Sequence, residues 1–437
     1  MLIEFSVANF GPFADEVTLS MVAANAYKEH RDRLIPSSAV GGDLVPLALV
    51  YGPNASGKST LLKAMAFMKS AVLDSFKTPV SKSIGYRPFL LNRQGDQTSS
   101  GFEVILIAED GNRYQYGFEA DAARIWREWL YYWPGGYFRT IFTREWSPEN
   151  DIYTWSPKRL GTNIPEYKSA WMDDVLPNRL FLSVVAQKLP ETPMKTVYNW
   201  FNDRLVIRGN NEIPPVETFH LLEQPEGKKW ILDWMRRADL TVSDVEIRRK
   251  MLAVYDVGTS LQEEGFDVGN FIHVEEGEGK KQSIESIKPI LFRGGEEQDR
   301  IPLPYRHESD GTQKWFEMAG FWKKILEQGQ IVLVDELETH LHHQLSEFLI
   351  DLFHNRKQNV KNAQLISTTH DVALMNEDLL RRDQVWICDK DASQSARLYP
   401  LSFFKPRKGE ALLNGYLAGR YGGIPRVRRL GPIGEPW

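Results

Sequence analysis

Short apolar runs and alternating apolar and polar residues mark the predicted strands of this chain. The first residues alternate and stop at Gly11-Pro12, which is a turn signal. Continuous apolar runs further along are typical of strands that are buried on both faces of a sheet. The strands predicted in this way cover residues 2–10, 17–21, 47–50, 180–185, 331–335 and 364–369.

The segment from 101 to 155 is rich in aromatic residues and has a β-like pattern. Apolar residues flank Asp110-Gly111, and Asp-Gly is a favoured tight turn between paired strands. Further apolar pieces at 129–133 and 137–142 extend the pattern. We therefore expect an antiparallel sheet in this segment.

Apolar residues at intervals of three and four predict the helices. Residues 256–282 are acidic and Gly-rich without a clear period, so a flexible excursion is expected there. The chain has no internal repeat and no sustained heptads, which excludes a long coiled coil. The helices predicted from the spacing cover residues 61–72, 192–204, 226–238, 315–326 and 341–352.

Composition is that of a globular protein. The 437 residues are 42% hydrophobic, enough for two or three domains, and the net charge of −5 gives no overall basic field. The one cysteine, Cys388, fits a reducing compartment and is expected in a buried strand. The first residues do not form a signal peptide and no apolar stretch reaches membrane-spanning length. We therefore expect a soluble, cytoplasmic protein that does not enter a membrane.

The segment from Gly52 to Thr60 fits the pattern G-x-x-x-x-G-K-[ST] between a predicted strand and a predicted helix. Glycines let the backbone curl around phosphate, Lys58 is expected to reach the β- and γ-phosphates, and Ser59 to coordinate Mg²⁺. The alternative is a glycine-rich turn before an ordinary helix, which the flanking pattern disfavours. The residues predicted to bind ATP here are Gly52, Asn54, Ser56, Gly57, Lys58, Ser59 and Thr60.

The apolar run that begins at Ile331 ends in two carboxylates, Asp335 and Glu336. Asp335 is predicted to hold Mg²⁺ directly or through water, and Glu336 to polarise the water that attacks the γ-phosphate. The alternative is a purely structural role, in which the two acids only start the next helix. After the strand at 364–369, His370 is predicted to sense the γ-phosphate, although a lone histidine at such a position is more often structural.

The stretch from Glu308 to Gln313 precedes the helix predicted at 315–326. A serine and a glycine at a helix start can bind an anion, although taken alone they form an N-cap. The stretch lies directly before the acidic strand and far from the P-loop in sequence, which suggests a second role in the nucleotide site. The residues assigned to that role are Ser309, Gly311 and Gln313.

With these motifs in order, the chain resembles the ABC-type ATPases of the SMC, Rad50 and RecF kind. It resembles more closely the AAA family ATPases labelled AAA_15 or AAA_21, which include RloA-like proteins and are often found in bacterial defence operons. The segments that carry the resemblance are, in chain order, the first strand at 3–10, the Walker A loop at 52–60, the signature at 308–313, the Walker B strand at 333–336, the D-loop at 339–342 and the switch histidine His370.

Three positions depart from the family pattern or match it only by order. Gly11 follows Phe10 where many relatives continue with arginine, and the signature begins Glu308-Ser309-Asp310 where they have Leu-Ser-Gly. Gln187 is matched to the Q-loop glutamine, which implies contact with ATP and Mg²⁺, on its order in the chain and its place after the strand predicted at 180–185.

The resemblance implies an α/β fold with an ABC-type P-loop ATPase core, an antiparallel β subdomain and an inserted helical or mixed subdomain, without a long coiled coil. The domains expected on this basis are an N-terminal lobe at 1–190, an inserted lid at 191–300, a C-terminal lobe at 301–404 and a basic tail at 405–437.

The resemblance also implies a homodimer or higher homo-oligomer with composite ATP sites. In such proteins each P-loop ATP is covered by the signature of the partner subunit, so Ser309 would meet the γ-phosphate across the interface. ATP would then favour the closed dimer and hydrolysis would release it.

No effector domain is visible beside the ATPase. The leading hypothesis is therefore a sensor or regulatory subunit of an anti-phage defence system that controls a separately encoded nuclease or toxin. The pair Asp389 and Asp391 resembles a metal-binding acid cluster, but too little chain follows it for a Toprim nuclease domain, and aspartates are common in loops.

Two other functions are weighed against this hypothesis. A RecF-like repair ATPase is the main alternative, because the tail from Lys405 has a local charge of +5 that could bind nucleic acid phosphates. Such a tail is more often a solvated or docking segment. A transport ATPase without its membrane half agrees less well with the β-rich segment and the insertion.

Overall fold

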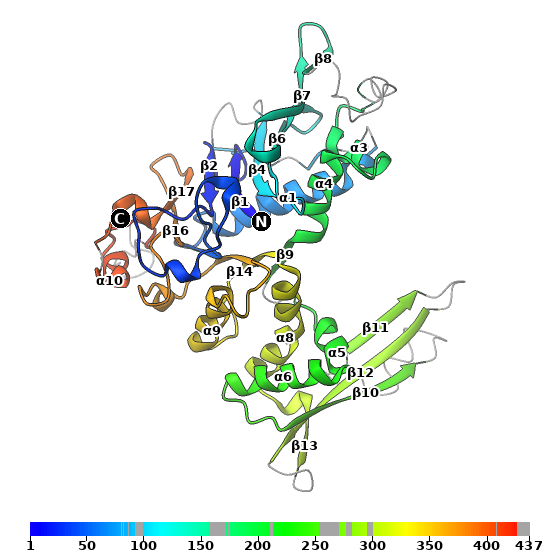
Figure 1. Ribbon diagram of the computed structural model, residues 1–437, viewed down its shortest axis with the longest axis vertical. Coiled ribbons are helices and arrows are strands. Elements are labelled where there is room, and N and C mark those ends of the chain that lie inside the picture. The colour runs from blue at the N-terminus through cyan, green and yellow to red at the C-terminus, as the bar shows by residue number, and fades with distance from the viewer. Residues whose placement is uncertain are drawn as a thin grey trace, which may run out of the picture. The chain divides into compact units, whose positions relative to one another are not determined.

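The computed structural model describes residues 1–79, 81, 83–85, 87–91, 99–156, 172, 175–209, 213–252, 271–276, 282–294, 300–407 and 409–425. The chain divides into two units, which are described one at a time (Figure 1). The first unit consists of Met1–Asn210, Ile325–Glu338 and Ser346–Trp437. The second consists of Asn211–Lys324 and Thr339–Leu345.

A six-stranded sheet in the first unit contains the strand that leads into the P-loop. Its order is β17-β16-β3-β15-β14-β9, and all neighbours are parallel except β16 and β17. Strands β3 and β15 are buried throughout, which explains their continuous apolar runs. Parallel strands end at one edge, so the residues after β3, β14 and β15 meet there. The strand bounds are β3 Leu47–Tyr51, β9 Leu205–Gly209, β14 Ile331–Asp335, β15 Gln364–Thr368, β16 Val385–Lys390 and β17 Ala396–Pro400.

A seven-stranded antiparallel sheet forms the other sheet of the first unit, in the order β2-β1-β4-β5-β6-β7-β8. Residue pairing places β4 and β5 around the predicted Asp110-Gly111 turn, so the predicted hairpin is confirmed. The strand bounds are β1 Leu2–Ala8, β2 Val17–Ser20, β4 Ser100–Ile107, β5 Arg113–Ala120, β6 Ile125–Trp133, β7 Arg139–Ser147 and β8 Ile152–Ser156.

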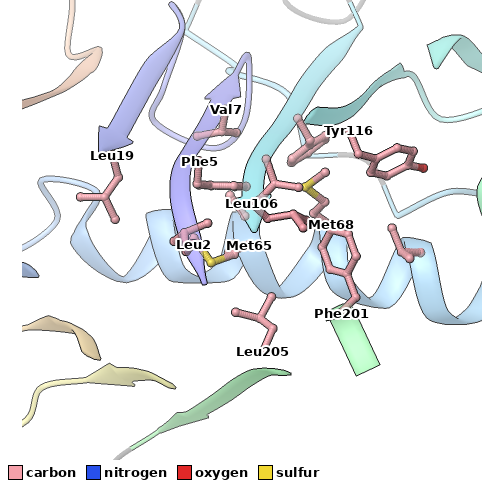
Figure 2. Close-up of a cluster of buried hydrophobic side chains, with 14 of the residues drawn as sticks. Leu2, Phe5, Val7, Leu19, Met65, Met68, Leu106, Tyr116, Phe201 and Leu205 are labelled. Carbon is pink, nitrogen blue, oxygen red and sulfur yellow. The ribbon is translucent and has the colours of Figure 1, made fainter. Parts of the chain in front are cut away.

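Helix α1, Lys58–Asp74, packs against both sheets. Met65 and Met68 of this helix share one buried cluster with Phe5 of β1, Leu106 of β4 and Leu205 of β9 (Figure 2). Burial of a side chain such as Met or Leu stabilises the fold by about 1.5–3 kcal/mol. The helix that starts at the P-loop lysine is therefore fixed by the main core of the first unit.

Residues 181–188 form a helix, so the strand predicted at 180–185 is wrong. Helix α3, Phe181–Lys188, is largely buried, so its apolar residues follow one another without a helical period. The carboxylate of Glu128 in β6 accepts hydrogen bonds from the amides of Phe181 and Leu182 at 2.8 and 3.0 Å. These bonds satisfy N–H groups that a helix start leaves free. The decisive partner is thus distant in sequence.

The segment after α3 is helical, as predicted for 192–204. Helix α4 covers Pro193–Asn199, and a π-helical turn follows over Trp200–Arg204. The side chain of Thr192 accepts a hydrogen bond from the amide of Lys195 and caps α4. The second unit begins at Asn211, so α4 belongs to the first unit.

The second unit combines helices with a small antiparallel sheet in the order β10-β12-β11, to which β13 adds by pairing with β12. Trp234 and Trp315 stack at 4.3 Å, and each indole N–H donates to the carbonyl of the other residue. This pair joins α6 to α8. The element bounds are α5 Val216–Leu222, α6 Pro225–Arg237, β10 Asp244–Leu252, β11 Phe271–Glu276, β12 Gln282–Arg293, β13 Ile301–Pro304 and α8 Asp310–Gln328, whose last residues belong to the first unit.

The flexible excursion predicted at 256–282 is wrong for its described part. Residues 271–276 form strand β11, which pairs with β12. Its apolar residues are few and stand between acidic and Gly-rich stretches, so the composition of the window hid the strand. The rest of that prediction, except Gln282, which begins β12, lies outside the described residues.

The end of the described chain packs into the core of the first unit, to which it belongs. Leu412, Tyr416 and Tyr421 are buried, and Tyr416 contacts Tyr51 of β3 edge to face at 6.0 Å. In the described ranges no helix is long and apolar enough to cross a membrane. The remaining helices are α9 His343–His354, α10 Leu412–Leu417 and short turns at Arg31–Arg33, Ser38–Val40, Ser75–Lys77, Pro134–Gly136, Tyr305–His307, Val372–Leu374 and Leu401–Phe404.

Candidate nucleotide site

The P-loop backbone requires glycine at two positions. Gly52 has φ 151° and Gly57 has φ 116°, both in the region that favours glycine. A Cβ on Gly52 would lie 2.1 Å from the carbonyl oxygen of Cys388, which stands on the neighbouring strand β16. The loop therefore follows β16 more closely than any side chain would permit.

Lys58 lies inside the curl of the loop. Its side chain is buried, and Nζ donates to the carbonyl oxygens of Gly52 at 2.8 Å and Pro53 at 3.1 Å. Burial lowers the pKa of Lys58 from its usual value, while the nearby acids, among them Asp335 and Glu336, act in the opposite direction. A confined cation at the start of a helix of 17 residues is suited to binding phosphate.

Cys388 of β16 contacts the P-loop through its thiol. The thiol is buried in β16, as predicted, and donates to the carbonyl oxygen of Ser56 at 3.1 Å. Burial raises the pKa of Cys388 to about 12, so the side chain is a neutral thiol. This packing role could not be read from a single cysteine in the sequence.

Ser59 and Asp335 meet at one carboxylate oxygen. The hydroxyl of Ser59 donates to Oδ1 of Asp335 at 3.0 Å, although the two residues are 276 positions apart. The hydroxyl of Thr368 donates to the same oxygen at 2.6 Å. Hydroxyl and carboxylate oxygens are the ligands that Mg²⁺ prefers, so these residues fit a magnesium site.

Thr368 is a residue to which the sequence assigned no role. Besides its bond to Asp335, its hydroxyl accepts a hydrogen bond from the amide of Glu336 at 2.8 Å. The signal that could have found it is its place at the end of a core strand, directly before Thr369 and His370.

Glu336 and His370 face each other at the edge of the sheet. His370 Nε2 lies 4.0 Å from Glu336 Oε1, and both side chains are about half exposed, at 41% and 52%. Glu336 has φ 56°, an unusual conformation for a residue with a side chain. Non-glycine residues held in this way cost about 1–3 kcal/mol and are common at functional sites.

The predicted signature lies in the second unit and starts α8. Ser309 Oγ accepts from the amide of Thr312 at 3.2 Å, which is an N-cap bond. Glu308 forms an ion pair with Arg293 at 2.7 Å, and Gln313 donates to the carbonyl oxygen of Glu308 at 2.9 Å. A Cβ on Gly311 would lie 3.6 Å from the carbonyl oxygen of His340, so the predicted D-loop passes beside it. These contacts of residues 308–313 are thus all with residues of the second unit.

The remaining predicted residues have plainer surroundings. Gln187 is exposed in the last turn of α3, and within the described residues no hydrogen bond joins it to the P-loop. Asn54 is exposed at the tip of the loop. Thr60 meets the end of the first strand, because a Cβ on Gly11, which has φ 56°, would lie 2.8 Å from the Thr60 methyl. Glycine at this departure from the family pattern therefore has a structural reason.

The Asp389-x-Asp391 pair is used for structure. Asp391 accepts from the amide of Ser393 at 2.8 Å and forms an ion pair with Arg397 at 3.0 Å. Asp389 accepts from the amide of Gly423 at 2.9 Å. Hydrogen bonds also lower the pKa of Asp391. Among the described residues no group of three or more His, Cys, Asp or Glu side chains is arranged for a metal ion.

Comparison with known proteins identifies a family. Residues 47–376 match the model of AAA_21, described as "AAA domain, putative AbiEii toxin, Type IV TA system". Comparison with curated proteins gives no match. The SMC head domain from Thermotoga maritima is similar at 12% identity over 91% of this chain and 98% of that chain, with a TM-score of 0.38. The recombination mediator protein RecF is similar at 12% identity over 91% and 98%, with a TM-score of 0.36.

The predicted fold class is confirmed. The P-loop follows strand β3, and the acidic pair stands at the end of β14. The antiparallel sheet packs against α1, and the residues of the second unit are inserted within the chain of the first. The family match, residues 47–376, includes β3, the P-loop, α1 and β14. The chain thus has an ABC-type ATPase fold, and its described residues form no long coiled coil, since α8 has 19 residues.

Proposed function

Because the chain belongs to the AAA_21 family of AAA domains, we propose that it binds ATP with Mg²⁺ at Gly52–Thr60 and hydrolyses it to ADP and phosphate. The observation that carries this proposal is the shared oxygen of Asp335, which accepts from Ser59 at 3.0 Å and Thr368 at 2.6 Å. This oxygen joins the P-loop, through Ser59, to the ends of β14 and β15, which lie far from the P-loop in sequence.

The P-loop amides, Lys58, Ser59 and Asp335 have different roles in this proposal. The amides between Gly52 and Lys58 bind phosphate oxygens, and the Lys58 ammonium group moves from the loop carbonyls to the β- and γ-phosphates. Ser59 and Asp335 hold Mg²⁺, which would neutralise charge on the phosphates.

Glu336 is the proposed general base. Its carboxylate is exposed enough to meet a water molecule, and it lies 4.0 Å from His370 Nε2. It accepts a proton from the attacking water as the oxygen approaches the γ-phosphorus. His370 donates a hydrogen bond toward the γ-phosphate and registers its departure.

The test is ATP hydrolysis by the purified full chain. Glu336→Gln is expected to lower kcat by roughly 100-fold or more and to leave ATP binding intact, because only the base is lost. Lys58→Ala is expected to lose nucleotide affinity instead. Exposed Glu327→Gln and Lys63→Ala, the latter on the same helix as Lys58, are the matched controls. Full hydrolysis by Glu336→Gln would exclude the assigned base, and absent hydrolysis by the unaltered chain would exclude the function.

The ATPase is further proposed to act as a dimeric switch in the cytoplasm. Ser309 and the first amides of α8 bind the γ-phosphate held by the partner subunit. The support is the capped, ordered start of this helix, where Ser309 bonds to Thr312. Gln187 is retained as a proposed contact to ATP and Mg²⁺, from α3 and not from a strand.

The switch is proposed to control a separate nuclease or toxin of a bacterial defence system. The support is the family, whose description names a toxin and a Type IV TA system. The purified chain, with and without ATP, is expected to leave DNA and RNA intact. Cleavage of either, lost on a substitution outside the ATP site, would place the effector in this chain.

The described part of the basic tail favours docking over nucleic-acid binding. Arg420 forms an ion pair with Glu410, and Tyr416 and Tyr421 are buried. A RecF-like role instead requires DNA binding that weakens steeply with salt and disappears when the tail from Lys405 is removed.

A further inference from the structure

The turn after β14 is joined to the end of β15 by three hydrogen bonds. The amide of Glu336 donates to the Thr368 hydroxyl at 2.8 Å, and the amide of Leu337 donates to the Thr368 carbonyl at 3.2 Å. The third bond reaches further, because the amide of His370 donates to Oε1 of Glu338 at 2.6 Å. Each strand end thus holds the other in place.

Glu338 is half-buried and is committed to this one bond. Its second oxygen, Oε2, is enclosed and has no hydrogen-bond partner in the part of the chain that the structure describes. A carboxylate that is partly desolvated binds an amide donor more strongly than a neutral acceptor does. The position of the His370 backbone therefore depends on Glu338.

The buried Tyr51 at the end of β3 shares this environment. Its hydroxyl is enclosed and has no hydrogen-bond partner in the described ranges. The negative charges of Asp371 and Glu338 are close enough to affect its pKa. Burial, with these charges adding to it, raises the pKa of Tyr51 well above its usual value. Tyr51 is therefore a neutral phenol in the environment of Glu338 and Asp371.

We propose that Glu338 is a positioning residue for hydrolysis, which holds His370 at its distance of 4.0 Å from Glu336. The proposal rests on the proposed ATPase function. Glu338 contacts the backbone of His370 and not the reacting atoms, so it acts through the imidazole. It is the only link of the three that fixes His370 itself.

The test compares Glu338→Ala with Glu338→Gln in the full chain. The alanine variant is expected to lower kcat about tenfold, the equivalent of one hydrogen bond to a charged group, with KM for ATP changed less than about twofold. The glutamine variant keeps an oxygen that accepts from the His370 amide, so most of kcat should return. Exposed Glu16→Ala in the same unit is the control. Unchanged kcat in Glu338→Ala, or equal losses in both variants, would overturn the proposal.

A double-variant cycle separates positioning from general support. In a His370→Ala background, Glu338→Ala is expected to cause no further fall in kcat, since the side chain that it positions is gone. Additive losses would overturn the proposal. If Glu338→Ala does not fold, Glu338→Asp replaces it, because the shorter side chain withdraws its carboxylate from the amide and should give the same fall.

These results are separable from failure of the ATPase function. If the unaltered chain hydrolyses ATP and Glu336→Gln does not, normal kcat in Glu338→Ala overturns the positioning role alone. If the unaltered chain does not hydrolyse ATP, the proposed function fails first.

Discussion

Thr368 shows how one hydroxyl group can organise an acidic site. Its hydroxyl donates a hydrogen bond to Asp335 and accepts one from the amide of Glu336, so it bonds to two adjacent residues. Valine has the same shape but neither bond, and a buried acceptor left without its donor costs about 1–3 kcal/mol. The side chain thus holds the carboxylate of Asp335 and the backbone of Glu336.

A second residue, His354, makes the stability of the first unit depend on pH. It is buried in α9 beside Gln384, and burial, with the charges of Arg33, His30 and Arg381, lowers the pKa of His354 from 6.5 to about 3. The nearest carboxylate, Asp351, lies 4.0 Å away. The folded protein therefore holds this histidine neutral, whereas the unfolded chain binds a proton below pH 6.5.

Stability from His354 is expected to be complete above pH 6.5 and to be lost as pH falls from 6.5 toward about 3. Between pH 7.5 and pH 5 the loss should reach about 2 kcal/mol, measured by urea unfolding. His354→Gln should remove this part of the pH dependence, while exposed His220→Gln should not. An unchanged pH dependence in His354→Gln would contradict the prediction.

At the scale of elements, a buried ion pair connects the antiparallel sheet to α3. Arg144 of β7 lies 2.8 Å from Glu128 of β6, and both side chains are fully buried. Glu128 also accepts from two amides at the start of α3. The Tyr116 hydroxyl also donates to Glu128 at 3.0 Å, so a cation, a helix N-terminus and a phenol together offset the desolvation of the carboxylate.

Arg144→Met is expected to destabilise the fold by about 3–5 kcal/mol, because it leaves Glu128 buried without its cation. Chemical denaturation of the full chain measures the change. Arg139→Met, at an exposed position in the same strand, should change stability by no more than about 0.5 kcal/mol. A loss under 1 kcal/mol in Arg144→Met would mean that the amides of α3 and the Tyr116 hydroxyl, which donates to Glu128 at 3.0 Å, stabilise the carboxylate without the cation.

The elements that sequence predicts well are those whose pattern is set locally. Strands β3, β14 and β15 are buried on both faces, so their apolar runs are unambiguous, and the P-loop and acidic pair follow them directly. Helix α3 was predicted as a strand because an apolar run that is buried all round has no period, and its partner Glu128 lies 53 residues away. The roles of Thr368 and Glu338 depend on strand ends meeting in space, which no local pattern contains.

At the scale of the whole molecule, the predicted signature and the P-loop belong to different units of the chain. Ser309 belongs to Asn211–Lys324, while Lys58 and Glu336 belong to the first unit. In the proposed dimer, a site completed by a second copy would use one unit of each chain. Nucleotide binding and assembly would then be a single equilibrium, in which each stabilises the other.

The chain is expected to form a dimer when ATP is bound. Glu336→Gln with ATP and Mg²⁺ should double its mass in light scattering during size exclusion, because it binds ATP without destroying it. Without ATP it should keep the smaller mass. Ser309→Arg in the same background should block the dimer and retain ATP, whereas exposed Ser83→Arg should not. The composite-site model fails if the mass ignores ATP in every variant.

Strand β3 stands between two strands that the ribosome makes much later. Val50 pairs with Thr368 on one side and Trp386 on the other. Contacts between residues so distant along the chain form slowly, because a long loop must close before they can stabilise anything. The nascent chain therefore displays the complete P-loop sequence long before it has the strands that hold the loop in shape. The P-loop is therefore expected to gain its folded shape only after β16 has been made.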